Sequence, residues 1–360
     1  MYTRSLLLAL LFLLLGGCLE FDAQDVTVVY DAKADRIDIH LVYRGLFVES
    51  GSGSTDRPME KALEDLAKVR DRGVFYFWCN YPFSFDLAGK LKGPVQALAN
   101  HVDVENGALF TDEKGVLCGH QFVRIREARA FAQKLNTILE LGAQVAMSEP
   151  IREGGTVRSF DDDTKEALRE FLRSGSRLLQ IEPGRIEVRL PCSAADHAWL
   201  KQRLEQYFLE NAPREMVRRV AVDERRAADG DRMDTTADPN KVAIEGAKVK
   251  DAVHDAASLR FFWDNDWSFV REEDLTRVAL GVKGADRLVV RKAGDGLYHD
   301  ALLTALRAKG EAIEEKIGAA ELERRFAAFR GRDAVLPPAL AALRTASKPE
   351  QASEAAAETK

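Results

Sequence analysis

The stretch that decides the fold class is Val26–Tyr43, with the sequence VTVVYDAKADRIDIHLVY. Apolar residues recur at every second position on either side of the polar segment Asp31–Asp35. A period of two is typical of a β-strand that buries one face, and a short polar segment between two such runs predicts a hairpin loop. The sequence therefore predicts an antiparallel pair of strands near the start of the chain.

The second strand of this hairpin also indicates which of its faces is buried. Its regularly spaced apolar residues are Ile37, Ile39, Leu41 and Tyr43. Successive side chains point to opposite faces of a strand, so Asp38 and His40 share the other face. With the odd-numbered residues in the core, we expect Asp38 and His40 to face solvent.

Hairpins and amphipathic helices alternate through the rest of the chain. Apolar residues between Phe131 and Val145 follow the spacing of a helix with one buried face. The acidic run Asp161–Asp163 suits the positive end of a second helix, and short apolar runs on both sides of Pro183-Gly184 predict another hairpin. This mixture predicts an α+β fold of two units, with antiparallel hairpins interspersed with amphipathic helices, rather than a doubly wound parallel sheet.

Composition indicates where the units begin and end. Residues 18–222 are expected to form an α+β domain, and residues 241–335 a smaller α+β unit. Between them, residues 223–240 are polar and short of large apolar side chains, which predicts a linker or a long surface loop. Residues 336–360 end in small and polar residues that cannot bury a core, so we expect a disordered tail.

The N-terminus carries the most specific pattern in the chain. Arg4 precedes the leucine-rich run Leu6–Leu15, which is shorter than the ~20 apolar residues of a membrane-spanning helix and has the length of a signal-peptide core. The following residues, Leu15-Gly16-Gly17-Cys18, resemble the bacterial lipobox. This resemblance implies a bacterial lipoprotein precursor, in which residues 1–17 are the signal peptide and Cys18 carries the lipid.

The resemblance also implies a place in the cell. Acyl chains on Cys18 would hold the protein to a membrane of the cell envelope. In such lipoproteins an Asp directly after the cysteine marks retention in the inner membrane, and Leu19 at this position favours the outer membrane. The segment Val26–Phe47 is similar to the opening of uncharacterised bacterial lipoproteins, which adds no function. Because strands begin within about ten residues of the lipid, we expect the folded domain to sit close to the membrane.

Composition excludes one class of partner and leaves the cysteine pairing open. The formal net charge is −6, with acidic and basic residues interspersed, whereas nucleic-acid-binding proteins usually carry a basic face. We therefore expect no nucleic-acid partner. With Cys18 lipidated, Cys79, Cys118 and Cys192 remain. This odd number allows at most one disulfide within the chain and does not choose the pair.

Cys118 and His120 form the pattern closest to a metal site. Residues two apart on a strand share a face, so both side chains could reach one ion. A zinc site takes three or four ligands, and the neighbouring sequence supplies no third. We therefore predict no metal site and no cofactor. A redox role for one of the thiols of Cys79, Cys118 or Cys192 is a separate hypothesis.

Asp196 and His197 could be read as an acid–base pair. However, Ser193 lies three residues before Asp196, the spacing of a capping box. This interpretation assigns Asp196 to the start of a helix and leaves His197 at the surface. The sequence contains no nucleophile elbow, phosphate loop or dinucleotide fingerprint, so we predict no catalytic residue.

Two aromatic stretches are the candidates for contact with a ligand. Their tryptophan and tyrosine candidates are Trp78, Tyr81, Trp263 and Trp267. Aromatic rings supply a large contact area at low entropic cost, although such residues also belong to strand cores. The leading hypothesis is a membrane-anchored envelope protein with an interaction or structural role. The alternative is a ligand-binding protein or an enzyme with a pocket between the two units.

Overall fold

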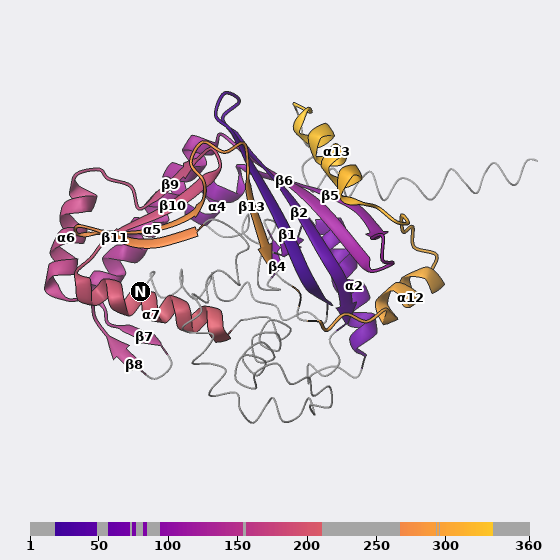
Figure 1. The fold of residues 1–360 in the computed structure, drawn as a ribbon, viewed down its shortest axis with the longest axis horizontal. Helices are drawn as coiled ribbons and strands as arrows, with labels where there is room; N and C mark the ends of the chain where they lie inside the picture. Colours follow the sequence, from indigo (N-terminus) through magenta and orange to yellow (C-terminus); the bar gives the residue numbers. More distant parts are fainter. Residues whose placement is uncertain are drawn as a thin grey trace, which may run out of the picture. The chain divides into compact units, whose positions relative to one another are not determined.

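The computed structural model describes residues 19–48, 57–72, 74–76, 82–84, 94–153, 156–210, 267–292, 294 and 296–333. The predictions for residues 1–17, for Cys18, for the linker at 223–240 and for the tail at 336–360 lie outside these residues. Figure 1 shows the helices and strands of the described residues, coloured along the chain.

The chain divides into two compact units, and neither is continuous in sequence. Unit 1 combines the chain up to Phe21 with residues 26–135 and with the chain from His299 onward. Unit 2 consists of residues 22–25 and 136–298. Two units were expected, but these boundaries differ from the predicted division into residues 18–222 and 241–335. The reason is strand pairing between segments far apart in the sequence, described below for unit 2.

Unit 1 is built on an antiparallel sheet. Its strands β1 (Leu19–Asp31), β2 (Arg36–Val48), β6 (Leu117–Arg126) and β5 (Val102–Thr111) are neighbours in that order. A turn at residues 32–35 joins β1 to β2, as the predicted hairpin requires. Strand β6 then pairs antiparallel with both β2 and β5.

Helices and short strands complete unit 1. They are α2 (Pro58–Arg72), β3 (Val74–Tyr76), β4 (Pro82–Ser84), α4 (Pro94–Ala99), the first part of α5 (Ala128–Ser148), α12 (Ala301–Ala308) and α13 (Ala319–Arg330). Helix α13 packs on the sheet, because the ring of Phe326 lies 5.2 Å from that of His40 and 6.1 Å from that of Phe122, between centroids.

The contact with α13 overturns the expectation that Asp38 and His40 face solvent. Asp38 is fully buried and His40 is 5% exposed, and Ile37 and Leu41 on the other face of β2 are also buried. Both faces of this strand therefore lie in the core. The alternating pattern had indicated a single buried face, because it carries no information about a helix that arrives almost 300 residues later in the chain.

An ion pair and several hydrogen bonds join charged side chains of the sheet to the end of α13. The buried Arg124 donates from Nε to Asp38 at 2.6 Å. Its other nitrogens donate to the carbonyl oxygens of Phe329 and Arg332, at 3.2 and 2.6 Å. Arg36 donates to the carbonyl of Arg330 at 2.5 Å. The last carbonyl groups of a helix have no partner within the helix, so these arginines fix the end of α13 to the sheet.

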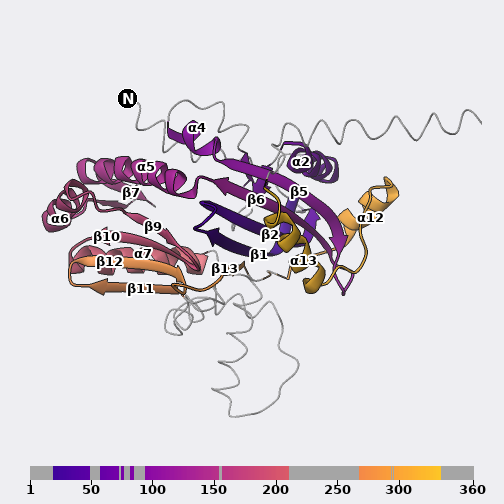
Figure 2. The same ribbon diagram turned by 90° about the horizontal axis from the view of Figure 1, so that it is seen from above.

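Unit 2 contains a second antiparallel sheet, with the strand order β11-β12-β10-β9. Its strands are β9 (Leu179–Glu182), β10 (Arg185–Pro191), β11 (Trp267–Glu272) and β12 (Leu275–Gly281). The predicted hairpin across Pro183-Gly184 is β9–β10. Strand β10 pairs along its whole length with β12, from the other side of the predicted linker. This pairing is why a boundary near residues 223–240 does not separate the units (Figure 2).

The other elements of unit 2 are the rest of α5, β7 (Ile151–Glu153), β8 (Thr156–Arg158), α6 (Asp162–Arg173), α7 (Ala194–Glu210) and β13 (Leu288–Lys292). Arg291 of β13 lies 3.5 Å from Asp25, which also belongs to unit 2. The predicted α+β class is thus confirmed. Within the described residues, no helix has the length and apolar character needed to cross a membrane.

Candidate functional site

Of the predicted ligand-facing aromatic residues, only Trp267 lies in the described part of the chain. Trp78, Tyr81 and Trp263 lie outside it, as does Cys79. Trp267 is the first residue of β11 and is half-buried. Its strand therefore shows which other side chains accompany it on the surface of unit 2.

Trp267 belongs to an apolar face of the second sheet. Residues directly opposite each other in an antiparallel pair point to the same face. Trp267 pairs with Leu280, and Phe269 pairs with Val278; on the next strand these residues meet Ile186 and Val188. We name these residues the apolar face: Trp267, Phe269, Val278, Leu280, Ile186 and Val188. Val188 is 40% exposed, and the other five are half-buried.

The opposite face of the same sheet is charged. It carries Arg185, Glu187 and Arg189 of β10 together with Arg277 of β12. Arg185 donates to Glu187 at 2.6 Å, and Arg189 lies over the ring of Phe171 on α6, 5.6 Å from its centroid. The sheet of unit 2 is thus apolar on one side and charged on the other.

A chain of three polar side chains lies at the end of the apolar face. The hydroxyl of Thr276 is 2.8 Å from Nδ1 of His197 and 2.9 Å from Sγ of Cys192. The ring of His197 also packs on Phe269, with 4.9 Å between centroids. Cys192 and Thr276 are each 1% exposed, whereas His197 is half-buried. His197 is therefore the most exposed residue of this group.

The electrostatics of this group favour its neutral forms. Burial raises the pKa of the Cys192 thiol, and the hydrogen bond with Thr276 only partly opposes this effect. Burial also lowers the pKa of His197, with a smaller effect from Arg271. A reactive cysteine needs its thiolate form. The arrangement therefore suits a hydrogen-bonded relay between neutral groups better than a thiolate–imidazolium pair.

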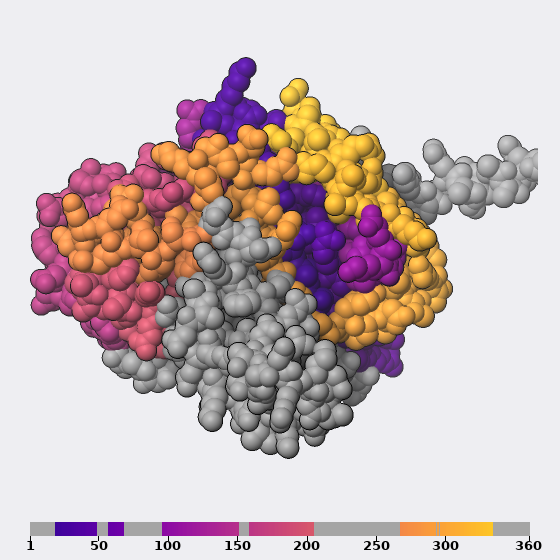
Figure 3. Space-filling view, viewed as in Figure 1, coloured from indigo at the N-terminus to yellow at the C-terminus, as the bar shows by residue number. Residues whose placement is uncertain are grey.

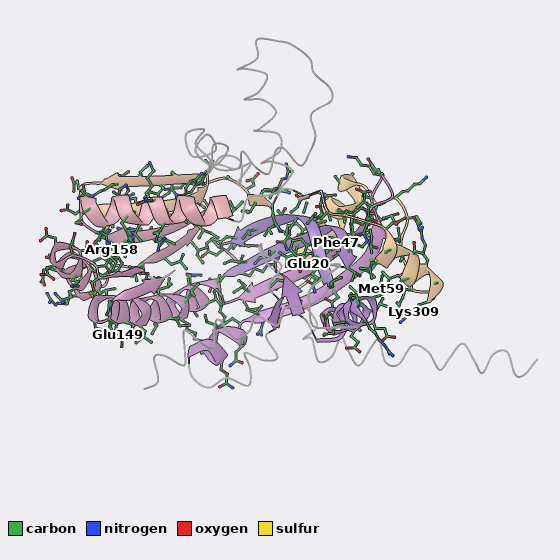
Figure 4. The ribbon with its side chains drawn as sticks, turned by 90° about the horizontal axis from the view of Figure 1, so that it is seen from below. Glu20, Phe47, Met59, Glu149, Arg158 and Lys309 are labelled. Carbon is green, nitrogen blue, oxygen red and sulfur yellow. The ribbon has the colours of Figure 1, made fainter. Side chains whose placement is uncertain are left out.

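Asp196 and His197 do not form an acid–base pair. The carboxylate of Asp196 is fully buried and accepts from Arg158 at 2.8 Å and from the backbone N–H of Asp161 at 2.9 Å (Figure 4 labels Arg158). The serine half of the predicted capping box is present, because the N–H of Asp196 donates to Ser193 Oγ at 3.1 Å. His197 is half-buried, and its ring contacts Thr276 and Phe269.

Cys118 and His120 are both buried in unit 1. Burial raises the pKa of the Cys118 thiol to about 11, and the thiol donates to the carbonyl of Val116 at 3.4 Å. No cluster of three or more metal-binding side chains occurs among the residues that the structure describes. Cys118 and Cys192 are both free thiols.

His120 instead forms an aromatic cluster with His40 beneath α13. Their ring centroids are 5.4 Å apart, and Phe122 lies 4.8 Å from His40 and 5.1 Å from His120. Within the described part of the chain, neither ring nitrogen of His120 has a hydrogen-bond partner, nor does Nε2 of His40. The alternating pattern did not indicate this pair, because it assigns His40 to the solvent-facing side of its strand.

Thr276 and Phe269 were also missed by the sequence pattern. Thr276 lies on β12, which pairs with β10 from far away in the chain, and Phe269 lies on β11, which pairs with β12. Comparisons of the chain with protein-family models, with curated proteins and with solved structures find no match. The function is therefore inferred from the residues and contacts described above.

Proposed function

We propose that this chain is a lipid-anchored envelope protein that binds a partner protein through the apolar face of unit 2. The anchor is proposed from the lipobox-like residues Leu15-Gly16-Gly17-Cys18. Strand β1 begins at Leu19, the residue after Cys18, and Leu19 and Phe21 are 3% and 2% exposed. A lipid on Cys18 would hold unit 1 at the membrane without a tether.

The observation that carries the interaction role is an apolar sheet face of half-buried side chains on which Val188 is exposed. Contiguous exposed apolar surface on a soluble unit often marks a binding site. Here Val188 is 40% exposed in the centre of β10, beside half-buried aromatic residues of β11. Figure 3 shows atoms of residues 267–292, coloured orange, on the side of the molecule that it draws. An apolar partner surface would remove these side chains from water at about 25 cal/mol per Å².

A second candidate function is the binding or turnover of a small ligand at His197. It is favoured by the hydrogen-bonded chain of His197, Thr276 and Cys192 beside an aromatic ring. A base held by a third group is a common arrangement in catalysis. The neutral, buried thiol and the absence of a positioned acid among the described neighbours make this candidate the weaker of the two.

The anchor is tested by intact mass and membrane fractionation of the wild type and of Cys18→Ser. Loss of acylation and of membrane association in the variant is the expected result. If the wild type and Cys18→Ser show the same acylation and the same location, the lipid anchor is refuted.

The interaction is tested separately by photo-crosslinking in cells. A photoreactive phenylalanine analogue replaces Val188 on the apolar face, or Arg169 on the exposed side of α6 as the matched control. We expect a discrete protein adduct from position 188 and none from position 169. Adducts of equal yield at both positions, or none at either, would contradict a specific binding face.

A further inference from the structure

The hairpin β1–β2 gives unit 1 two distinct ends. Both strands have 13 residues and are neighbours in the sheet. The start of β1 at Leu19 and the end of β2 at Val48 therefore lie at one end, and the turn at residues 32–35 lies at the other. A strand of this length spans roughly 40 Å at about 3.3 Å per residue. We name the end that holds Leu19 and Val48 the proximal end.

Three other segments of unit 1 meet at the proximal end. Helix α12 packs on β2, and Nε2 of His299, just before this helix, lies 2.9 Å from the carbonyl oxygen of Val48. The turn between β5 and β6 belongs to the same end, because the start of β6 pairs with the later part of β2. The segment 311–317 is hydrogen-bonded to the end of β5. Figure 1 shows α12 and the β1–β2 turn at opposite ends of these strands.

We propose that the direct junction of Cys18 and Leu19 holds the proximal end on the headgroups of the bilayer, with the β1–β2 turn directed away from it. This inference deepens the proposed function and rests on its lipid anchor. The Cα atoms of consecutive residues are about 3.8 Å apart, so a lipid on Cys18 would begin one residue from the sheet. Leu19 is 3% exposed and already belongs to β1. No spacer therefore separates the anchor from the proximal end.

The surface of the proximal end suits polar headgroups rather than the hydrocarbon of the bilayer. The large apolar side chains of α12 are buried, namely Leu302, Leu303 and Leu306. Arg307 of this helix donates to Glu315 at 2.7 Å, and both side chains are about half exposed. Moving charged groups into hydrocarbon is costly, so this surface should stay among the headgroups. Because acidic and basic residues are interspersed on it, anionic lipid should not be required.

Quenching by lipids that carry a spin label on the headgroup tests this orientation. The full-length, acylated protein is reconstituted in phosphatidylcholine vesicles that contain the quencher. A fluorescent amino acid replaces Lys309 at the proximal end, or Lys33 in the β1–β2 turn as the matched control, since both lysines are exposed. We expect several-fold stronger quenching at position 309 than at position 33. Equal quenching at the two positions, or stronger quenching at position 33, would overturn the orientation.

A spacer variant separates the orientation from the anchor. A Gly/Ser linker of about 16 residues, inserted between Cys18 and Leu19, has an end-to-end distance of about 22 Å. Membrane association should persist in this variant, whereas quenching at position 309 should fall several-fold. Unchanged quenching at position 309 would overturn the role of the direct junction. An intact mass without acyl chains would refute the proposed anchor itself, whereas an acylated protein that is quenched equally at both positions would refute only the orientation.

Discussion

Acidification should destabilise unit 1 through the buried histidines. Burial, with smaller effects from His120 and Arg44, lowers the pKa of His40 to about 3. Burial and then Arg325 lower the pKa of His120 to about 4, against an opposing effect of Glu314. The pKa of both imidazoles is 6.5 without these surroundings.

The sign and size of the effect follow from proton binding. Above about pH 7.5 both imidazoles are neutral in the folded and unfolded chain, so they leave the free energy of unfolding unchanged. Below pH 6.5 the unfolded chain takes up protons that the folded chain excludes, and stability falls until the pH reaches the folded pKa values. At pH 5 each histidine lowers the free energy of unfolding by about 2 kcal/mol, and the pair lowers it by about 4 kcal/mol. The free energy of unfolding of a domain is typically roughly 5–15 kcal/mol.

Urea unfolding followed by circular dichroism measures this effect. The wild type, His40→Leu, His120→Leu and the double variant are compared between about pH 7 and pH 5, a window above the range in which most carboxylates titrate. Between these two pH values the free energy of unfolding should fall by about 4 kcal/mol for the wild type and by about 2 kcal/mol for each single variant. It should change little for the double variant. The reasoning fails if the wild type and the double variant lose the same stability over this range.

Three further predictions concern single side chains. A Cβ at Gly107 would lie 2.3–2.5 Å from three ring atoms of His120, so Gly107→Ala should cost about 1–3 kcal/mol; an unchanged melting temperature would contradict this packing. The side-chain amide of Asn136 donates to the carbonyl of Leu179 at 2.9 Å and accepts from its N–H at 2.8 Å. Asn136→Leu leaves both backbone groups unpaired and should lower the free energy of unfolding by about 1–3 kcal/mol for each group; an unchanged urea midpoint would contradict this. The Cys118 thiol is buried, with its pKa raised to about 11, so a thiol reagent at neutral pH should label it only in urea, as peptide mass mapping would show.

The sequence predicted local structure well where the pairing partner is close in the chain. The alternation in Val26–Tyr43 gave the hairpin β1–β2, and Pro183-Gly184 gave the hairpin β9–β10. In each case a short turn brings the two strands together, so the period of two and the turn residues contain the information needed. The α+β class follows from such local elements.

Contacts between distant segments were beyond the reach of these patterns. Val188 pairs with Val278, and neither run of residues indicates its partner. The same holds for Phe326, which covers His40 from the far end of the chain. The two-unit division and the buried histidine pair both depend on such contacts. A pattern read along one sequence gives the period of a strand, but it does not identify the element that packs on it.

The attachment of α13 provides a final test of whether unit 1 opens locally. Arg124 is 2% exposed and joins Asp38 to the carbonyls of Phe329 and Arg332. Arg124→Lys keeps the charge but loses the planar set of donors, and each hydrogen bond from a charged group contributes about 1.5–3 kcal/mol. We therefore expect residues 319–330 to lose hydrogen-exchange protection by at least ten-fold, while α6 of unit 2 keeps its own. Equal loss in both helices would mean that Arg124 stabilises the whole chain. A loss confined to α13 would identify this helix as the part that yields first, and the two histidines beneath it as the groups that acid then reaches.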